Sequence, residues 1–395
     1  MSQRQRSGIV AFCLGGLLLA GCGSSSGGDG ADLRSYDFSQ GAARPARPDV
    51  GPGTGTPFPF VPPPNPAPTS LLYVTESEGD SLAVYDPETF ELVERVPAGE
   101  DPRGLSYDTQ RGRVLVSLLD GTVLSFDADD LEAAPQSTAP VVDPGSLALL
   151  YDETNDTVWV SSLSEFNNIV ALAASTLTGL SGSPVADPAL VGMATMEMND
   201  TGNRLYVSQS TVGSPNVAVI DAATRTLLYI VNTAADPSGS TDELCDGLAY
   251  HPSYDYLYVG NIDFITTGND SVVVLDAAQE PPVEIGRVAS GQGPSSLALD
   301  LGRNRLYATN YTGSAVQVFT LAETGTPIAL LQTLPTEEGP VSVAYDAEND
   351  HIITSNFDSD TLTVYDAETL QQIPGSPFTA GDGPNSLYLY TPPAL

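Results

Sequence analysis

The sequence predicts an all-β protein: a seven-bladed β-propeller of four-stranded antiparallel blades over residues 70–395. One strand pattern, an apolar run that ends in a small polar residue, recurs seven times along this region. The second residue of each copy is Tyr73, Leu115, Trp159, Tyr206, Tyr258, Tyr307 and Ile353, so neighbouring copies lie 42 to 52 residues apart. A period of this length, made of short strands and turns, is typical of a propeller in which each repeat forms one blade.

Each repeat carries four strand signals. A Gly-Pro or Asp-Pro turn precedes an inner strand, the recurrent strand comes second, and a third strand and a weaker outer strand follow. The predicted inner strands are 104–108, 146–150, 247–251, 296–300, 342–346 and 386–390. The predicted third strands are 82–86, 123–127, 169–173, 217–221, 272–276, 316–320 and 362–366. An outer strand is clear only at 91–96, 227–232 and 329–334. Their near-continuous apolar runs suit strands that are buried on both faces.

The phase of the repeat predicts how the ring closes. The array begins with a strand of the second kind at Leu72 and ends with an inner strand at 386–390. The C-terminal strand must therefore join the N-terminal blade, which removes open sheet edges.

Many acidic residues have a predicted structural role in turns. Asp86, Asp221 and Asp366 each end a third strand and are followed three residues later by Thr. Asp108, Asp300 and Asp346 end inner strands in the same way. A carboxylate at such a position accepts backbone N–H groups of the turn, so we do not count these six residues as site candidates.

The first 69 residues are predicted to lie outside the ring. Arg4 and Arg6 precede an apolar run over 9–19, which is typical of a secretory signal in residues 1–21. The run is shorter than the roughly 20 residues that a membrane-spanning helix needs. Residues 22–69 are rich in Gly, Ser and Pro, which predicts a flexible tether.

The strands LYVTE, LYVSQ, LYVGN and LYATN, with a following VxVxD strand and a later GPxS turn, resemble the YVTN repeat. That repeat belongs to a seven-bladed family of YncE-like periplasmic proteins, surface-layer proteins and lactonase-type propellers. The resemblance covers residues 70–395 and implies the propeller fold, whereas propellers in general serve many functions.

The end of the signal, Leu19-Ala20-Gly21-Cys22, resembles the lipobox of bacterial lipoproteins. This resemblance implies a lipid on Cys22 and an envelope protein anchored to a membrane; the alternative is an ordinary cleaved signal. Because Gly23 and Ser24 follow rather than Asp, the resemblance favours the outer membrane, with the ring in the periplasm or on the cell surface. Membrane fractionation of a Cys22→Ala variant would test this expectation.

The charge of the chain excludes some partners. The net charge is −36, with 50 acidic residues, and every basic residue is an arginine. Such a surface repels nucleic acid and phosphorylated substrates, so we expect no nucleic-acid partner. The acidic excess also suits solubility in saline surroundings.

Cysteine and histidine are scarce. Once Cys13 and Cys22 are set aside, Cys245 has no partner for an intrachain disulfide and is predicted to be a buried small residue, with an intermolecular bridge as the alternative. The two histidines, His251 and His351, are predicted on the face opposite the channel mouth, which argues against a Ser-His-Asp arrangement at the mouth.

The candidate site lies where the loops before the inner strands and the loops between second and third strands meet around the channel mouth. Two of these loops, 232–246 and 261–271, are long, and 209–216 lies beside them. Arg103 is expected to pair with Asp101, or else to hold a ligand carboxylate. The candidate ligand-binding residues are Asp101, Arg103, Asp242, Glu243, Asp246, Asp263 and Asp270.

Four of these acids, Asp242, Asp246, Asp263 and Asp270, are oxygen ligands of the kind that Ca²⁺ prefers. Their spacing does not match an EF-hand, and the alternative is that they are solvated loop residues. We expect no required cofactor.

Two functions follow as hypotheses. The first is a non-enzymatic, lipid-anchored module that binds a protein, a glycan or a small cationic ligand at the acidic mouth. The alternative is a lactonase-like or other carboxylate- or metal-dependent hydrolase at the same face. A ring that serves only as an envelope building block stays open as well. The sequence assigns no catalytic residue.

Overall fold

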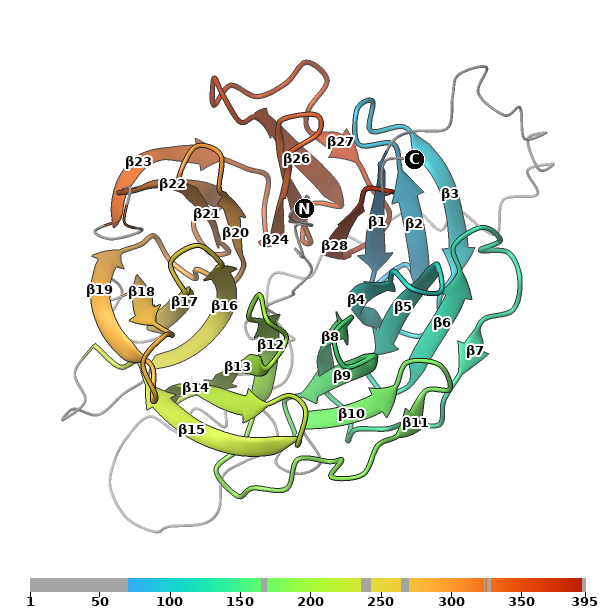
Figure 1. The fold of residues 1–395 in the computed structure, drawn as a ribbon. Coiled ribbons are helices and arrows are strands. Elements are labelled where there is room, and N and C mark those ends of the chain that lie inside the picture. The colour runs from blue at the N-terminus through green and yellow to red at the C-terminus, as the bar shows by residue number, and fades with distance from the viewer. Residues whose placement is uncertain are drawn as a thin grey trace, which may run out of the picture.

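The computed structural model describes residues 70–164, 169–235, 243–263, 270–322, 324 and 328–392. This part of the chain forms seven four-stranded sheets that stand around one axis as a ring (Figure 1). The fold is a seven-bladed β-propeller. None of the described residues forms a helix that could span a membrane. The predicted signal and tether, residues 1–69, lie outside the described residues.

Within each blade the four strands are ordered from the axis of the ring outward. The inner strands, from blade one to blade seven, are β28 (Pro384–Tyr390), β4 (Pro102–Asp108), β8 (Ser146–Asp152), β12 (Met193–Met198), β16 (Glu243–His251), β20 (Leu297–Asp300) and β24 (Pro340–Asp346). The second strands are β1 (Leu71–Glu76), β5 (Arg113–Leu118), β9 (Thr157–Ser162), β13 (Arg204–Thr211), β17 (Tyr256–Asp263), β21 (Arg305–Asn310) and β25 (His351–Asn356).

The third strands are β2 (Ser81–Tyr85), β6 (Val123–Asp127), β10 (Ile169–Ala173), β14 (Ser214–Asp221), β18 (Ser271–Asp276), β22 (Ala315–Leu321) and β26 (Thr361–Asp366). The outer strands are β3 (Leu92–Pro97), β7 (Gln136–Ser137), β11 (Thr178–Gly179), β15 (Thr226–Asn232), β19 (Val283–Ala289), β23 (Ile328–Pro335) and β27 (Phe378–Thr379).

The ring closes as predicted. The C-terminal strand β28 pairs antiparallel with β1, so blade one combines one C-terminal strand with three N-terminal strands. Side chains reinforce this junction: the Ser386 backbone N–H donates to Thr75 Oγ1 at 3.0 Å, and Asn385 Nδ2 donates to Ser77 Oγ at 2.8 Å.

The fourth residue of the recurrent strand joins neighbouring blades. Thr75 Oγ1 accepts the Ser386 N–H of its own blade and donates to the Arg103 carbonyl of the next blade at 3.1 Å. Ser161 makes the same two bonds from blade three. Blade five has Gly260 instead, because a Cβ there would lie 2.1 Å from the Pro294 carbonyl oxygen. In blades one and three this hydroxyl therefore links neighbouring blades, which explains the small polar residue at that position of the motif.

The fifth residue of the same strand holds the loop that leads into its own blade. Gln209 Nε2 donates to the carbonyls of Ala189 and Val191 at 2.8 and 3.1 Å. Asn261 Nδ2 donates to the Thr233 carbonyl at 2.5 Å. These bonds satisfy backbone groups that the irregular loops would otherwise leave without partners.

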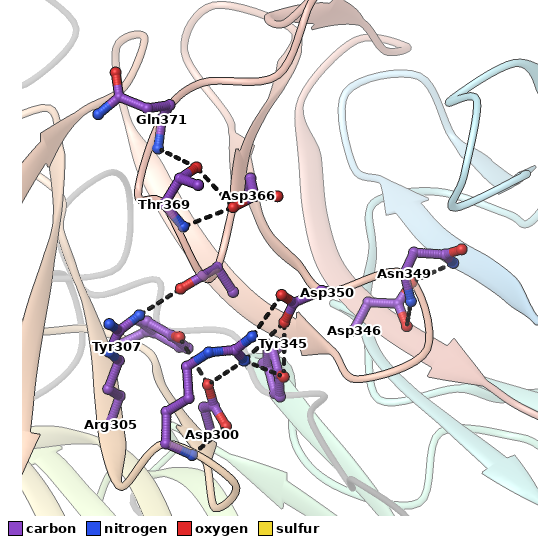
Figure 2. A network of polar contacts seen from close by, with 12 residues as sticks. Asp300, Arg305, Tyr307, Tyr345, Asp346, Asn349, Asp350, Asp366, Thr369 and Gln371 are labelled. Carbon is purple, nitrogen blue, oxygen red and sulfur yellow. Dashed lines mark hydrogen bonds and ion pairs between the residues drawn. The ribbon is translucent and has the colours of Figure 1, made fainter.

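The opposite face carries ion-pair clasps between blades. Arg303 contacts Asp300 Oδ2 at 3.0 Å in its own turn and Asp350 Oδ2 at 2.6 Å in the next blade. The Tyr345 hydroxyl donates to Asp350 Oδ1 at 3.0 Å, and Figure 2 shows Asp300, Tyr345 and Asp350 gathered at this junction. Arg111 forms the same clasp with Asp108 and Asp156 between blades two and three.

The predicted turn acids act as expected. Asp366 Oδ1 accepts the Thr369 backbone N–H and the Thr369 hydroxyl, both at 2.7 Å (Figure 2). Asp221 and Asp86 accept the equivalent backbone N–H groups of Thr224 and Thr89. The inner-strand acids Asp108, Asp300 and Asp346 cap their turns in the same way.

Several predicted boundaries were wrong. The inner strand predicted at 146–150 runs two residues further, to Asp152, whose carboxylate caps the turn as Asp108 does in blade two. The stretch 209–216, predicted as a loop, is a tight hairpin of β13 and β14. The loop predicted over 232–246 ends in strand β16, which begins at Glu243. In each case cross-strand pairing extends a strand through polar residues that resemble a loop in sequence.

Exposed outer edges are protected in two ways. Blades two, three and seven have outer strands of only two residues. Blades one, four, five and six have longer ones that each contain a bulge, with Val93, Leu228, Ile285 or Leu331 as the extra residue. A bulge twists an edge away from pairing with another chain, and short edges offer little to pair with.

Candidate ligand site at the mouth of the ring

The candidate site is built on a repeated irregularity at the start of the inner strands. In blade five the register shifts between Cys245 and Leu248, so Asp246 and Gly247 together face one residue of β17. Most inner strands shift at the equivalent place, near the residues with which they begin. In blade five, Asp246 lies two positions before the buried Leu248. We call this residue and its equivalents in the other inner strands the mouth ring: Arg103, Leu147, Ala194, Asp246, Ser295, Val341 and Asn385.

Four members of the mouth ring are polar, and all four are buried: Arg103, Asp246, Ser295 and Asn385. Buried polar groups are normally satisfied by hydrogen bonds, so each needs a partner or a functional explanation. Ser295 Oγ pairs with Thr309 Oγ1 at 2.9 Å, and Asn385 Nδ2 bonds Ser77. The two charged members require separate treatment.

Arg103 is paired with Asp101, as predicted. Its Nε lies 2.6 Å from Asp101 Oδ1, and its Nη2 donates to Asp101 Oδ2 at 2.9 Å. Asp101 adopts a left-handed backbone conformation, with φ of 51°, in the turn that leads into β4. This ion pair engages the guanidinium of Arg103, so the arginine serves first to order the turn.

Asp246 differs from the other carboxylates in the described part of the mouth. Its side chain is fully buried, and neither carboxylate oxygen accepts a hydrogen bond of normal geometry from any described residue. The nearby Ser210 hydroxyl donates to the Cys245 carbonyl at 3.0 Å and compensates the Asp246 carboxylate only in part. Burial therefore raises the pKa of Asp246 well above its usual range. A buried acid with a strongly perturbed pKa at a channel mouth is a candidate functional group.

The other predicted acids of this sector are structural. Glu243 Oε2 accepts the Ala235 backbone N–H at 2.9 Å. Asp270 Oδ1 accepts the backbone N–H groups of Asp263 and Gly293 at 3.2 and 3.3 Å, and burial raises the pKa of Asp270. All three side chains are buried, so the alternative that these acids are solvated is wrong for them.

A metal ion has no evident site among the described residues. No group of three or more His, Cys, Asp or Glu side chains there is arranged to hold one. Asp242, the fourth predicted Ca²⁺ ligand, lies outside the described residues. The Ca²⁺ site therefore stays a prediction.

The rim of the mouth is acidic. We call the loops before the inner strands and between the second and third strands the mouth loops. Their described parts contain no arginine, whereas they expose eight carboxylates: Glu78, Asp80, Glu100, Asp120, Glu337, Glu338, Asp358 and Asp382. This rim favours cations and neutral molecules over anions.

Cys245, beside Asp246, is fully buried and makes no disulfide. Its Sγ contacts the Asn216 carbonyl oxygen at 2.5 Å, and burial raises the pKa of the thiol, which makes it unreactive. His251 ends β16 and His351 begins β25, so both lie at the end of the ring opposite the mouth, as predicted.

Comparisons with known proteins agree with the seven-bladed propeller fold. The family model "Lactonase, 7-bladed beta-propeller" matches residues 245–388, from the start of the blade-five inner strand to the closing strand. A comparison of the sequence with curated proteins found no match.

Solved structures share the fold at low identity. A periplasmic gluconolactonase of Pseudomonas aeruginosa is 16% identical, covering 82% of this chain and 99% of its own, with a TM-score of 0.62. A candidate 6-phosphogluconolactonase of Bacteroides uniformis is 13% identical over 81% and 99% of the two chains, with a TM-score of 0.64. Hydrazine synthase of Kuenenia stuttgartiensis is 16% identical over 75% and 92%, with a TM-score of 0.62. Such different proteins establish the fold and not the activity.

The sequence named Asp246 as a candidate but did not distinguish it from its acidic neighbours. Alignment of the seven repeats by their second strands would have done so, because only Arg103 and Asp246 place a charge in the mouth ring. The polar members Ser295 and Asn385 were missed, since an isolated Ser or Asn before a strand resembles an ordinary turn residue.

Proposed function

We propose that this protein hydrolyses an uncharged lactone at the mouth of the ring, with Asp246 as the general base. The observation that carries the proposal is the fully buried Asp246 carboxyl, which lacks a normal hydrogen-bond partner among the described residues. A base works best when its pKa lies near the operating pH, and burial moves the pKa of Asp246 in that direction.

In this reaction the ionised Asp246 takes a proton from a water molecule. The water oxygen forms a bond to the lactone carbonyl carbon, and a tetrahedral intermediate results. The ring C–O bond then breaks, its electron pair stays on the departing oxygen, and that oxygen takes back the proton held by Asp246 to become a hydroxyl. The product is the open-chain hydroxy acid, and Asp246 returns to its starting state.

The acidic rim restricts the substrate to an uncharged molecule. The exposed acids of the mouth loops and the net charge of −36 repel a phosphorylated lactone. The same field repels the carboxylate product, which helps it leave. A neutral sugar lactone meets both requirements.

The match of the lactonase family model to residues 245–388 supports this proposal, because it begins beside Asp246 and includes all of blade five's described inner strand from that point. The acidic rim alone would equally suit a module that binds a cationic ligand without turnover. That second function, and the lipid anchor predicted at Cys22, stay predictions.

The experiment compares the Asp246→Asn variant with a Glu348→Gln control. Glu348 is exposed on the opposite face, so its loss should leave turnover unchanged. We expect the wild-type chain to hydrolyse glucono-1,5-lactone faster than its 6-phosphate. Asp246→Asn should lower kcat by about 100-fold or more, which is typical for the loss of a general base.

Melting curves of both variants establish that they fold. Turnover by Asp246→Asn at the wild-type rate would refute the assignment of Asp246. A wild-type chain that binds a cationic ligand at the mouth but hydrolyses no lactone would instead support the binding module.

A further inference from the structure

Tyr311 is unusual among the residues that follow the second strands. The equivalent positions are Ser77, Leu119, Leu163, Ser210, Ile262 and Phe357. Among the described mouth loops, Tyr311 and Phe357 are the two aromatic residues, and Phe357 is buried. Tyr311 is half-buried, so it offers the one partly accessible aromatic ring in these loops as far as they are described.

Tyr311 is fixed by one hydrogen bond at its side chain and one at its backbone. Its hydroxyl donates to Asp358 Oδ2 at 2.9 Å, which joins a loop of blade six to a loop of blade seven. Its backbone N–H donates to the Gly293 carbonyl at 3.2 Å. A side chain fixed before binding loses little rotamer freedom when a ligand arrives, which is the usual property of a positioning residue.

The backbone makes room for this arrangement. Gly339 has a φ of 73°, and a Cβ at that position would lie 2.4 Å from Asp358 Oδ2. Any larger residue would therefore displace the carboxylate that holds Tyr311. Burial and the negative charges of Asp358 and Glu78 raise the pKa of Tyr311, so its hydroxyl stays a proton donor to Asp358 throughout the physiological range.

We infer that Tyr311 is a positioning residue whose ring face receives the flat face of a cyclic ligand at the mouth. The inference deepens the proposed function and rests on it. Blade six, which carries Tyr311, is the immediate neighbour of blade five, which carries Asp246. A ring stacked on Tyr311 would lie where the loops of blades six and seven meet, with Asp246 at the start of the inner strand of the adjacent blade five. Aromatic faces are common in ligand sites because they combine large contact area with fixed geometry.

The experiment separates the ring from its hydroxyl. Tyr311→Ala removes the stacking face, whereas Tyr311→Phe keeps the ring and removes only the bond to Asp358. Tyr254→Ala, a half-buried tyrosine at the opposite end of the ring, is the matched control. For each variant we would measure kcat and KM with glucono-1,5-lactone. Binding of glucose, a ring without an ester, would be measured by saturation-transfer NMR.

Tyr311→Ala should raise KM roughly fivefold to tenfold, the effect of losing one aromatic contact, and leave kcat within about twofold. It should also abolish the glucose signal. Tyr311→Phe should keep KM within about threefold. A merely structural tie between blades would instead lower the melting temperature equally in both Tyr311 variants without changing KM.

The outcomes distinguish this inference from the proposed function. A wild-type chain that binds glucose through Tyr311 but hydrolyses no lactone supports the stacking role and refutes the hydrolase. A chain that hydrolyses the lactone with an unchanged KM in Tyr311→Ala supports the hydrolase and overturns the stacking role. A KM change of equal size in Tyr254→Ala, or no glucose binding by the wild-type chain, overturns it as well.

Discussion

A carboxyl group buried without a good partner destabilises a fold when it is ionised, and Asp246 is such a group. Its pKa is raised in the folded protein, whereas in the unfolded chain it lies near 3.9. Above about pH 4 the native state therefore binds its proton more tightly than the unfolded state does. Stability must fall, relative to a variant without this group, as pH rises through that window.

We predict that the melting temperature of Asp246→Asn rises relative to that of the wild-type protein as pH increases from about 4 to 7. The expected difference in unfolding free energy is up to about 1.4 kcal/mol per pH unit while Asp246 stays protonated in the native state. Thermal melts of both proteins across this range measure it. Parallel curves would show that the buried carboxyl has an ordinary pKa.

A different set of acids acts in the opposite direction. Hydrogen bonds from Thr369 lower the pKa of Asp366, and Arg111 lowers the pKa of Asp156. Their stabilising effect is present above the unfolded pKa and is lost as pH falls through the folded pKa. Both acids persist in Asp246→Asn, so this acid-side loss should be the same in the variant and the wild-type protein.

Residue-level predictions from sequence succeeded where the cause is local. The bond between Asp101 and Arg103 and the turn-capping role of Asp366 depend on residues two or three positions apart. The burial of Asp246 depends on neighbours that are distant in sequence, such as Thr195, whose hydroxyl donates to the Asp246 carbonyl. Sequence spacing does not contain that information, so the state of Asp246 could not be predicted.

At the scale of strands, the repeat predicted which elements exist better than where they end. The seven second strands follow from one motif, and the structure explains its polar end through bonds such as Thr75 to Arg103 and Gln209 to Ala189. The outer strand β19 was missed because apolar and polar residues do not alternate regularly in its sequence, VEIGRVA, which contains a bulge. Strand ends depend on pairing with neighbours, so they were the least predictable feature.

The clasp around Arg303 gives a prediction at this scale. Replacing Arg303 by Ala removes contacts to Asp300 and Asp350 and leaves Asp300, whose carboxylate is almost fully buried, with fewer partners. We expect a loss of about 1–3 kcal/mol in unfolding free energy, the range for a partly buried charged hydrogen bond. Denaturant unfolding measures it.

Arg113→Ala is the control for this clasp. Arg113 makes one exposed hydrogen bond, to Gln136 at 3.2 Å. Its replacement by Ala should lower the unfolding free energy by at most about 0.5 kcal/mol. Equal losses in the two variants would mean that the bond between blades six and seven adds nothing to stability.

The whole molecule combines a strongly acidic surface with a ring that holds itself together. At a net charge of −36, mutual repulsion between surface acids opposes the compact state. Seven clusters of buried apolar side chains, one between each pair of neighbouring blades, offset that repulsion together with the pairing of β28 with β1. Because closure joins the two ends of the chain, it makes the stability of each blade depend on the others.

Removing the closing strand should therefore affect the entire ring. Truncation before Pro384 removes β28, takes from Thr75 and Ser77 their hydrogen bonds to that strand, and deprives Tyr107 of Tyr390, whose ring centroid lies 4.0 Å away. We expect loss of the cooperative melt, followed by circular dichroism. Truncation after Tyr390 removes only residues beyond β28 and should leave the melt unchanged.

A rearranged chain tests whether the missing inner strand, rather than the junction of the two chain ends, causes this loss. Leu71 lies opposite Tyr390 in the β1–β28 pair, so a two-residue Asn-Gly turn can connect the two strands as a hairpin. Residues 384–390 placed before Leu71 in this way supply the same inner strand from the N-terminus, while residue 383 becomes the new end. We predict that this permuted chain regains the cooperative melt lost on truncation. If it stays unfolded although the strand is present, the missing strand alone does not explain the loss, and joining the two chain ends within one blade is required for stability.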